Sequence, residues 1–133
     1  MADHESIQKL ADALVNELTE AGKAVATAES CTGGWIAKAI TDIAGSSAVF
    51  GYGVVSYANG AKESLIGVQN KTLEEHGSVS AEVVTEMAQG TLGLSGADIA
   101  VAVSGVAGPA GGSGHRLRQP RPRRATNEQG QEG

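Results

Sequence analysis

The segment that indicates the fold class most clearly is Ala24-Val25-Ala26-Thr27-Ala28-Glu29-Ser30-Cys31-Thr32-Gly33-Gly34-Trp35-Ile36-Ala37-Lys38-Ala39-Ile40. Its first five residues are small and partly β-branched, which predicts a strand over residues 24–28. The glycine pair forms a turn, and residues 35–40 then resume the spacing of a helix. A strand, a glycine turn and a helix in this order are the beginning of an α/β unit.

The segments on either side fit the same architecture. Strands are predicted over residues 48–57 and 98–103, and the second is a continuous apolar run typical of a strand covered on both faces. The predicted fold class is therefore α/β, a single layered domain with a β-sheet covered by helices. Apolar residues recur at three- and four-residue spacing in the other segments, which predicts helices over residues 6–21, 61–66, 72–75 (one turn) and 81–92.

The composition fits one domain with many tight turns, since 133 residues include 19 glycines against three prolines and 41% hydrophobic residues. No apolar run reaches the roughly 18 residues of a membrane span, and the N-terminus is acidic where a signal peptide would be basic. We therefore expect a cytoplasmic protein with no membrane partner. The single cysteine excludes an internal disulfide, and the scattered histidines predict no structural metal.

Acidic and basic residues are distributed unevenly along the chain. Residues 1–113 carry five lysines, no arginine and thirteen acidic residues, whereas residues 114–133 carry five arginines and two glutamates. The arginines lie in one nine-residue stretch that also holds two prolines, and no helical or strand period continues there. We expect residues 1–113 to form the domain and residues 114–133 to be a disordered basic tail. Without interleaved aromatic residues or a folded module, the tail does not predict a nucleic-acid partner.

Two glycine-rich loops follow predicted strands, at residues 29–34 and 104–112. The first opens a helix, so its backbone N–H groups and the helix dipole would face an anion such as a phosphate. Neither loop matches GxxxxGK[ST] or GxGxxG, which argues against an NTP-binding P-loop and a dinucleotide fingerprint. Glycines that serve only tight turns are the alternative interpretation.

Side chains that could act as nucleophile and base lie in and near these loops. Lys62 follows the predicted strand over 48–57, and a lysine desolvated in a cleft can lose its proton and act as base to a serine. A solvated surface lysine is the alternative. Cys31 is a second candidate nucleophile, but no histidine lies near it and we interpret it as a packing residue. The hydroxyl residues of the cluster are Ser30, Thr32, Ser46, Ser47 and Ser104.

Four strings carry a resemblance to a known family: Thr27-Ala28-Glu29-Ser30-Cys31-Thr32-Gly33-Gly34, Gly45-Ser46-Ser47, Gly53-Val54-Val55-Ser56-Tyr57-Ala58-Asn59-Gly60-Ala61-Lys62 and Ser104-Gly105-Val106-Ala107-Gly108-Pro109. In this order they resemble the C-terminal domain of the CinA (competence-damage) family, which includes stand-alone nicotinamide-nucleotide amidohydrolases. The resemblance covers about residues 6–113. It implies hydrolysis of the carboxamide of nicotinamide mononucleotide to nicotinate mononucleotide and ammonia, without a metal or another cofactor.

The resemblance also implies roles for single residues. Ser47 would be the nucleophile and Lys62 its general base, with Ser30 and Ser104 as hydroxyl partners of the reacting amide and its oxyanion. The nucleotide would be the small-molecule partner, and the glycine loops would hold its phosphate. The oligomeric state, including a homo-oligomer, stays open, and the alternative function is a non-catalytic regulatory or interaction module. The implied substrate-binding residues are Thr32, Gly33, Gly34, Tyr57, Asn59, Gly105, Gly108 and Gly111.

The sequence departs from the family pattern at Gly114. Members of the family continue through two strands and a long final helix that supplies an arginine to the site. Residues 115–124 instead resemble a G+C-rich coding sequence that is translated out of frame, which we interpret as a frame error. On this interpretation the domain lacks the family's C-terminal strand and helix, and we expect the chain to be inactive and only marginally stable.

Overall fold

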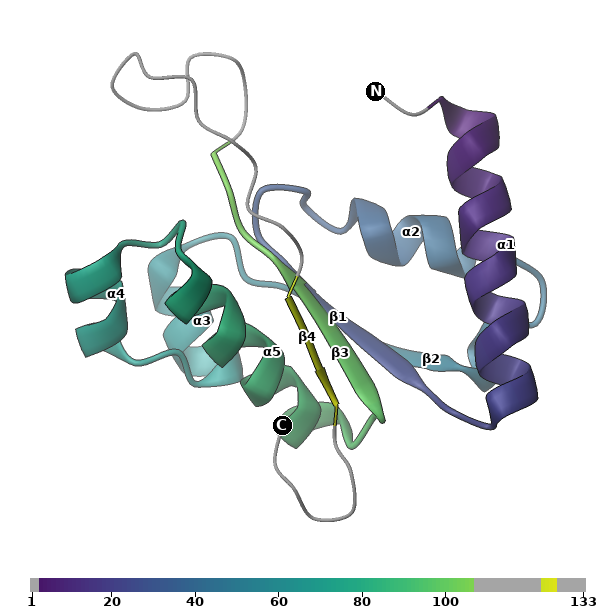
Figure 1. The fold of residues 1–133 in the computed structure, drawn as a ribbon. Coiled ribbons are helices and arrows are strands. Elements are labelled where there is room, and N and C mark those ends of the chain that lie inside the picture. The colour runs from purple at the N-terminus through teal and green to yellow at the C-terminus, as the bar shows by residue number, and fades with distance from the viewer. Residues whose placement is uncertain (1–2, 107–122, 127–133) are drawn as a thin grey trace.

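The computed structural model describes residues 3–106 and 123–126 (Figure 1). Every helix and strand expected within residues 1–106 is present, with ends that differ by a few residues. The elements in chain order are α1 (His4–Ala21), β1 (Val25–Glu29), α2 (Trp35–Thr41), the 3₁₀ turn η1 (Ser46–Ala48), β2 (Phe50–Val55), α3 (Asn59–Ile66), α4 (Asn70–His76), α5 (Ala81–Ser95), β3 (Ile99–Val103) and β4 (Arg123–Thr126).

The strands form one sheet in the order β2-β1-β3-β4. The first three are parallel, and β1 pairs with β2 on one side and with β3 on the other. All five residues of β1 are buried, as expected for a strand with neighbours at both edges and helices on both faces. The predicted α/β layered domain is confirmed.

Strand β4 is a departure from the sequence-based expectation. Residues 123–126 pair antiparallel with β3, in a register that places Ala125 opposite Ala100. A disordered tail is therefore the wrong prediction for these four residues. The physical reason is that the edge of β3 offers backbone N–H and C=O groups to any extended segment free of proline, and this segment begins just after the last proline of the chain. The rest of the predicted tail lies outside the described residues.

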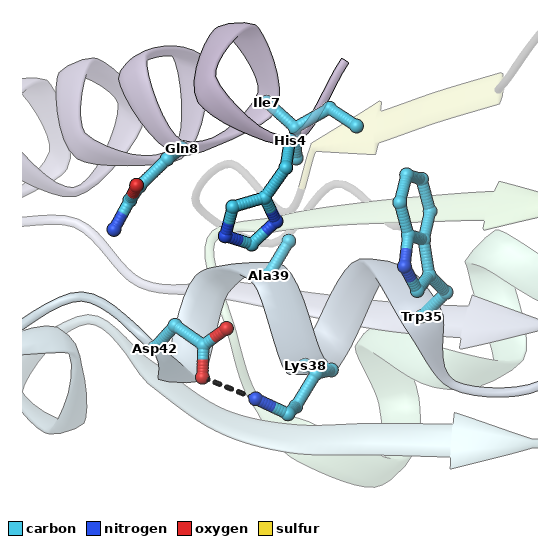
Figure 2. Close-up of a pocket in the computed structure, with 7 residues that line it drawn as sticks. All are labelled: His4, Ile7, Gln8, Trp35, Lys38, Ala39 and Asp42. Carbon is cyan, nitrogen blue, oxygen red and sulfur yellow. Dashed lines mark hydrogen bonds and ion pairs between the residues drawn. The ribbon is translucent and has the colours of Figure 1, made fainter. Parts of the chain in front are cut away.

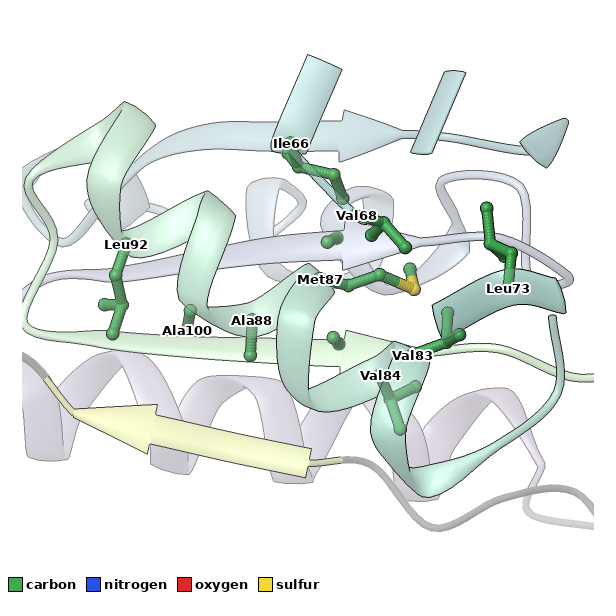
Figure 3. Close-up of a cluster of buried hydrophobic side chains, with 11 residues drawn as sticks. Ile66, Val68, Leu73, Val83, Val84, Met87, Ala88, Leu92 and Ala100 are labelled. Carbon is green, nitrogen blue, oxygen red and sulfur yellow. The ribbon is translucent and has the colours of Figure 1, made fainter. Parts of the chain in front are cut away.

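Helices cover both faces of the sheet, so the domain has three layers (Figure 1). Helices α1 and α2 lie on one face, and α3, α4 and α5 lie on the other. Each interface has its own apolar core. The core under α1 and α2 contains Ala11, Val15, Leu18, Val25, Ile40, Ile43 and Val49. The core under α5 contains Ala28, Ile66, Val68, Leu73, Val83, Val84, Met87, Ala88, Leu92, Ala100 and Ala102 (Figure 3).

The helix ends combine local and distant signals. Ser80 caps α5 as predicted, because its side chain accepts a hydrogen bond from Val83 N. Helix α5 continues through Gly93 to Ser95, since one interior glycine costs only about 1 kcal/mol relative to alanine. Helix α4 begins at Asn70 instead of Thr72, because Glu86 on α5 accepts hydrogen bonds from Gln69 N (2.9 Å) and the Thr72 hydroxyl (2.6 Å). In the described part of the chain, no helix has the length and apolar character needed to cross a bilayer.

Gly90 is required where α5 crosses α3. A Cβ atom at this position would lie 1.7 Å from the carbonyl oxygen of Ile66, the last residue of α3. We expect Gly90→Ala to lower the free energy of unfolding by about 1–3 kcal/mol or more through overpacking. Gly93 lies in the same helix with open space around its Cα, so Gly93→Ala should instead stabilise by roughly 0.5–1 kcal/mol. Urea unfolding of both variants measures this, and equal stability of the two would contradict the packing.

Candidate active site

Three serines lie in a row at the carboxyl edge of the parallel strands. Glu29, the last residue of β1, pairs with Val55 of β2 and with Val103 of β3. The next residue of each strand is a serine, which gives the order Ser56, Ser30 and Ser104 across the edge. Backbone hydrogen bonds hold this row, since Ser56 N donates to Glu29 O and Ser30 N donates to Val103 O. The carboxyl edge is where parallel α/β sheets place their binding groups.

Lys62 reaches the middle serine of this row. Its Nζ lies 3.1 Å from Ser30 Oγ and 3.2 Å from the carbonyl oxygen of Tyr57. Lys62 is 1% exposed and Ser30 is 5% exposed, so both groups are removed from bulk water. In the described part of the chain no carboxylate forms an ion pair with Lys62. Burial therefore lowers the pKa of the Lys62 ammonium, which favours the neutral amine that a general base requires.

Ser30 is held in place by its own contacts. Its hydroxyl donates to the carbonyl oxygen of Tyr57 at 3.4 Å, a long contact, and accepts from Lys62. The Tyr57 carbonyl thus touches both members of the pair, whereas the Tyr57 side chain is exposed. Asn59 is also exposed and begins α3, the helix that carries Lys62. The expected juxtaposition of Lys62 with a loop serine is present, and the serine is Ser30.

Ser104 and Thr32 lie nearby, but their hydroxyl groups point elsewhere. Ser104 Oγ donates to the carbonyl oxygen of Ser78 at 2.8 Å, which ties the end of β3 to the loop before α5. Thr32 Oγ1 donates to Glu29 at 2.6 Å. Gly33 and Gly34 both have positive φ, so they make the turn between β1 and α2. Gly105 follows Ser104 and is partly exposed, and Gly108 and Gly111 lie outside the described residues.

Ser47 lies at the opposite end of the parallel strands, near their amino ends. It is exposed in η1, which comes before β2, and the neighbouring Val49 carbonyl accepts a hydrogen bond from Val25 N at the start of β1. Lys62 comes after β2. A six-residue strand spans about 20 Å at roughly 3.3 Å per residue. The prediction of Ser47 as the partner of Lys62 is therefore wrong within one chain, because the strand between them separates the two side chains.

The amino end of α2 is already occupied by a charge of the protein itself. Glu29 is 1% exposed, and its carboxylate accepts hydrogen bonds from Ile36 N and Ala37 N, both at 2.9 Å. The Glu29 carboxylate thus satisfies these two N–H groups of the helix and disfavours a second anion beside them. Phosphate binding by the glycine loop over residues 29–34 stays a prediction.

Cys31 follows Ser30 but lacks the environment of a reactive thiol. Burial raises the pKa of the Cys31 thiol, and the charge of Glu29 acts in the same direction against the opposing effect of Lys62. A raised pKa disfavours the thiolate, which is the nucleophilic form. The interpretation of Cys31 as a packing residue is consistent with this environment.

A cavity of about 310 Å³ lies away from this cluster, between α1 and α2 (Figure 2). It is lined by His4, Ile7, Gln8, Trp35, Lys38, Ala39 and Asp42. Lys38 and Asp42 form an ion pair across one turn of α2. The cavity contains neither Ser30 nor Lys62, which meet on the α3 side of the sheet, so we do not assign it to the same site.

Two buried residues at the carboxyl edge, Ser56 and Glu29, are not among the site residues predicted from the sequence. Ser56 is fully buried, and its hydroxyl has no hydrogen-bond partner among the described residues. Glu29 is the buried carboxylate at the end of the central strand. The sequence contains a signal for each of them. A serine directly follows each of the three parallel strands, and an acidic residue at the end of a strand of small apolar residues is unusual.

Together these contacts define the class of protein: an α/β domain with a buried serine–lysine pair at the carboxyl edge of a parallel sheet. The sequence profile described as the CinA C-terminal domain matches residues 7–117. The chain therefore belongs to the CinA C-terminal domain family, and the resemblance carried by the four strings is confirmed. The match ends at residue 117, three residues beyond Gly114, at which we expect the sequence to depart from the family pattern.

Two relatives share more than half of the aligned residues with this chain. The chain is similar to the nicotinamide-nucleotide amidohydrolase PncC of Escherichia coli strain K12, with 56% identity over 113 residues that cover 85% of this chain and 68% of that protein. The PncC protein of Enterobacter agglomerans is 63% identical over 92 residues, which cover 69% of this chain and 56% of that protein. The chain thus spans roughly half to two thirds of these relatives.

Solved structures show the same fold. The competence/damage inducible protein CihA from Agrobacterium tumefaciens superposes with a TM-score of 0.78 at 51% identity, covering 80% of this chain and 65% of that chain. A CinA superfamily protein from Escherichia coli superposes with a TM-score of 0.81 at 29% identity, covering 99% of this chain and 82% of that chain.

Proposed function

We propose that the chain is an amidohydrolase domain that hydrolyses the carboxamide of nicotinamide mononucleotide to nicotinate mononucleotide and ammonia. The observation that carries the mechanism is the 3.1 Å contact between Lys62 Nζ and Ser30 Oγ, in surroundings that favour a neutral lysine. The nicotinamide-nucleotide amidohydrolases that share 56% and 63% identity with this chain support the substrate class.

In this mechanism neutral Lys62 takes the hydroxyl proton of Ser30 while Oγ attacks the carboxamide carbon. The tetrahedral intermediate collapses as Lys62 returns the proton to the departing ammonia, which leaves an ester on Ser30. Lys62 then deprotonates a water molecule that attacks the ester, and returns this proton to Ser30 Oγ as the second tetrahedral intermediate collapses. The products are free Ser30 and the carboxylic acid, which loses its own proton to solvent at neutral pH and becomes the carboxylate. Each proton taken by Lys62 is returned, so the cycle consumes one amide and one water.

The residues that would hold the nucleotide lie at the same edge. Tyr57 and Asn59 are exposed beside the serine–lysine pair, and Gly105 follows Ser104. We propose that these residues, with Gly108 and Gly111 beyond the described part, contact the ribose and phosphate. The amino end of α2, which Glu29 fills, is left out of the phosphate site.

The test measures ammonia and nicotinate mononucleotide released from nicotinamide mononucleotide. It compares this chain, the E. coli relative and a hybrid in which residues 1–113 precede the C-terminal segment of that relative. We propose that the hybrid is active and that the chain itself is much slower, because its sequence departs from the family pattern at Gly114. A folded hybrid that binds the nucleotide without releasing ammonia would contradict the proposal and favour a non-catalytic interaction module.

Cys31→Ala tests whether the Cys31 thiol takes part in the reaction. Because a raised pKa keeps the Cys31 thiol protonated, we expect the hybrid with this change to keep kcat/KM within about a factor of three. The assay is the same ammonia release at neutral pH. Loss of activity in a variant that melts like its parent would assign Cys31 a chemical role and sink the present assignment.

A further inference from the structure

Glu29 has an unusual position for an acidic residue. It ends the central strand of the sheet, is 1% exposed and is followed directly by Ser30. A buried carboxylate is costly unless hydrogen bonds compensate for its lost hydration. Here three donors do so, namely Thr32 Oγ1 at 2.6 Å and the backbone N–H groups of Ile36 and Ala37 at 2.9 Å.

These donors link the carboxylate to the turn that carries Ser30 and to the helix that follows this turn. Thr32 lies within the turn, whereas Ile36 and Ala37 lie in the first turn of α2. The backbone closes the same turn, since Gly33 N donates to Ser30 O and Trp35 N donates to Thr32 O. The direction of the Ser30 side chain thus depends on a loop that Glu29 ties to the sheet and to the helix.

We infer that Glu29 is a positioning residue, whose carboxylate fixes the turn after β1 so that Ser30 Oγ stays within hydrogen-bond distance of Lys62 Nζ. The inference rests on the proposed function, in which Ser30 is the nucleophile. Glu29 does not touch the reacting atoms. It acts because a nucleophile displaced by about 1 Å loses up to 10²-fold in rate.

The chain contains a matched control. Glu86 also places a carboxylate at a helix start, where it accepts hydrogen bonds from Gln69 N and the Thr72 hydroxyl. Its contacts hold α4 and do not involve Ser30 or Lys62. Glu29→Gln and Glu86→Gln therefore remove the same charge from the same kind of cap, and only the first lies beside the serine–lysine pair.

The experiment measures how fast a fluorophosphonate, which modifies activated serines, labels the 133-residue chain at a series of pH values, with intact-mass detection. We expect Glu29→Gln to lower the maximal labelling rate by about ten- to a hundredfold without moving the midpoint of the pH profile, which belongs to Lys62. Glu86→Gln should label like the parent even if it melts at a lower temperature.

The outcomes separate the two claims. If the parent is not labelled at Ser30, the proposed nucleophile fails and the positioning role fails with it. If the parent is labelled and Glu29→Gln is labelled equally fast, only the positioning role is overturned. Should Glu29→Gln fail to fold, Thr32→Val removes one of the three hydrogen bonds to the carboxylate, and its labelling must then be slower than that of Glu86→Gln.

Discussion

Ser30→Ala should lower kcat/KM of the hybrid enzyme by about 10⁴-fold or more, the scale on which removal of a serine nucleophile acts in other hydrolases. The physical reason is the loss of the only hydroxyl that lies 3.1 Å from Lys62 Nζ in the described residues. Because the change deletes a single buried oxygen, the melting temperature should change little. Ammonia release under substrate saturation measures the loss.

Ser47→Ala is the matched control for this prediction. Ser47 is exposed at the amino edge of the sheet, so its hydroxyl has no path to Lys62 within one chain. We expect this variant to stay within about threefold of the parent, as surface substitutions usually do. The reverse pattern, with Ser47→Ala inactive and Ser30→Ala active, would return the nucleophile to Ser47 and require a second chain to bring it to Lys62.

Lys62→Met should lower the rate by about 10²–10⁴-fold, the usual contribution of a general base. Lys62 is a buried residue of α3, and methionine keeps an apolar stem of similar length, so we expect the fold to be retained. The parent rate should rise with pH through the lowered pKa of Lys62, since only the neutral amine accepts the serine proton. A variant that keeps both the parent rate and its pH profile would remove Lys62 from the mechanism.

The same substitution should also change how the free energy of unfolding depends on pH. Burial lowers the pKa of Lys62 in the folded state below the ordinary value of 10.5, so between these two values the unfolded chain binds more protons. The free energy of unfolding of the parent therefore rises with pH across this window. Lys62→Met lacks this dependence. The amount by which its free energy of unfolding exceeds that of the parent should therefore be largest below this pH window and shrink as pH rises. Urea unfolding of both proteins along a pH series measures the difference.

Local patterns were sufficient to predict most of the fold. The apolar spacing of α1, the continuous apolar run of β3 and the Ser80 cap of α5 are properties of neighbouring residues. Two features depend on residues far apart in the sequence. The start of α4 is fixed by Glu86, 17 residues from Gln69, and β4 forms because the edge of β3 is available to an extended segment.

The candidate site could be predicted only in part, because it also depends on contacts between residues far apart in the sequence. The sequence identifies Lys62 as a candidate base, and its contact with Ser30 joins residues 32 positions apart through the parallel order of the strands. The pairing of Ser47 with Lys62 fails because a strand is predicted between them, and that strand alone puts the two residues at opposite ends of the sheet's strands. The role of Glu29 at α2 needs the side-chain direction, which no sequence spacing gives.

In the proposed mechanism Ser30, activated by Lys62, is the reactive serine. The most direct measurement treats the 133-residue chain with the fluorophosphonate and locates the modified residue by tandem mass spectrometry. We expect one label, on Ser30, whose rate of formation rises with pH and which is nearly absent in Lys62→Met. A label on Ser47, or labelling of Ser30 at the parent rate in Lys62→Met, would contradict this mechanism.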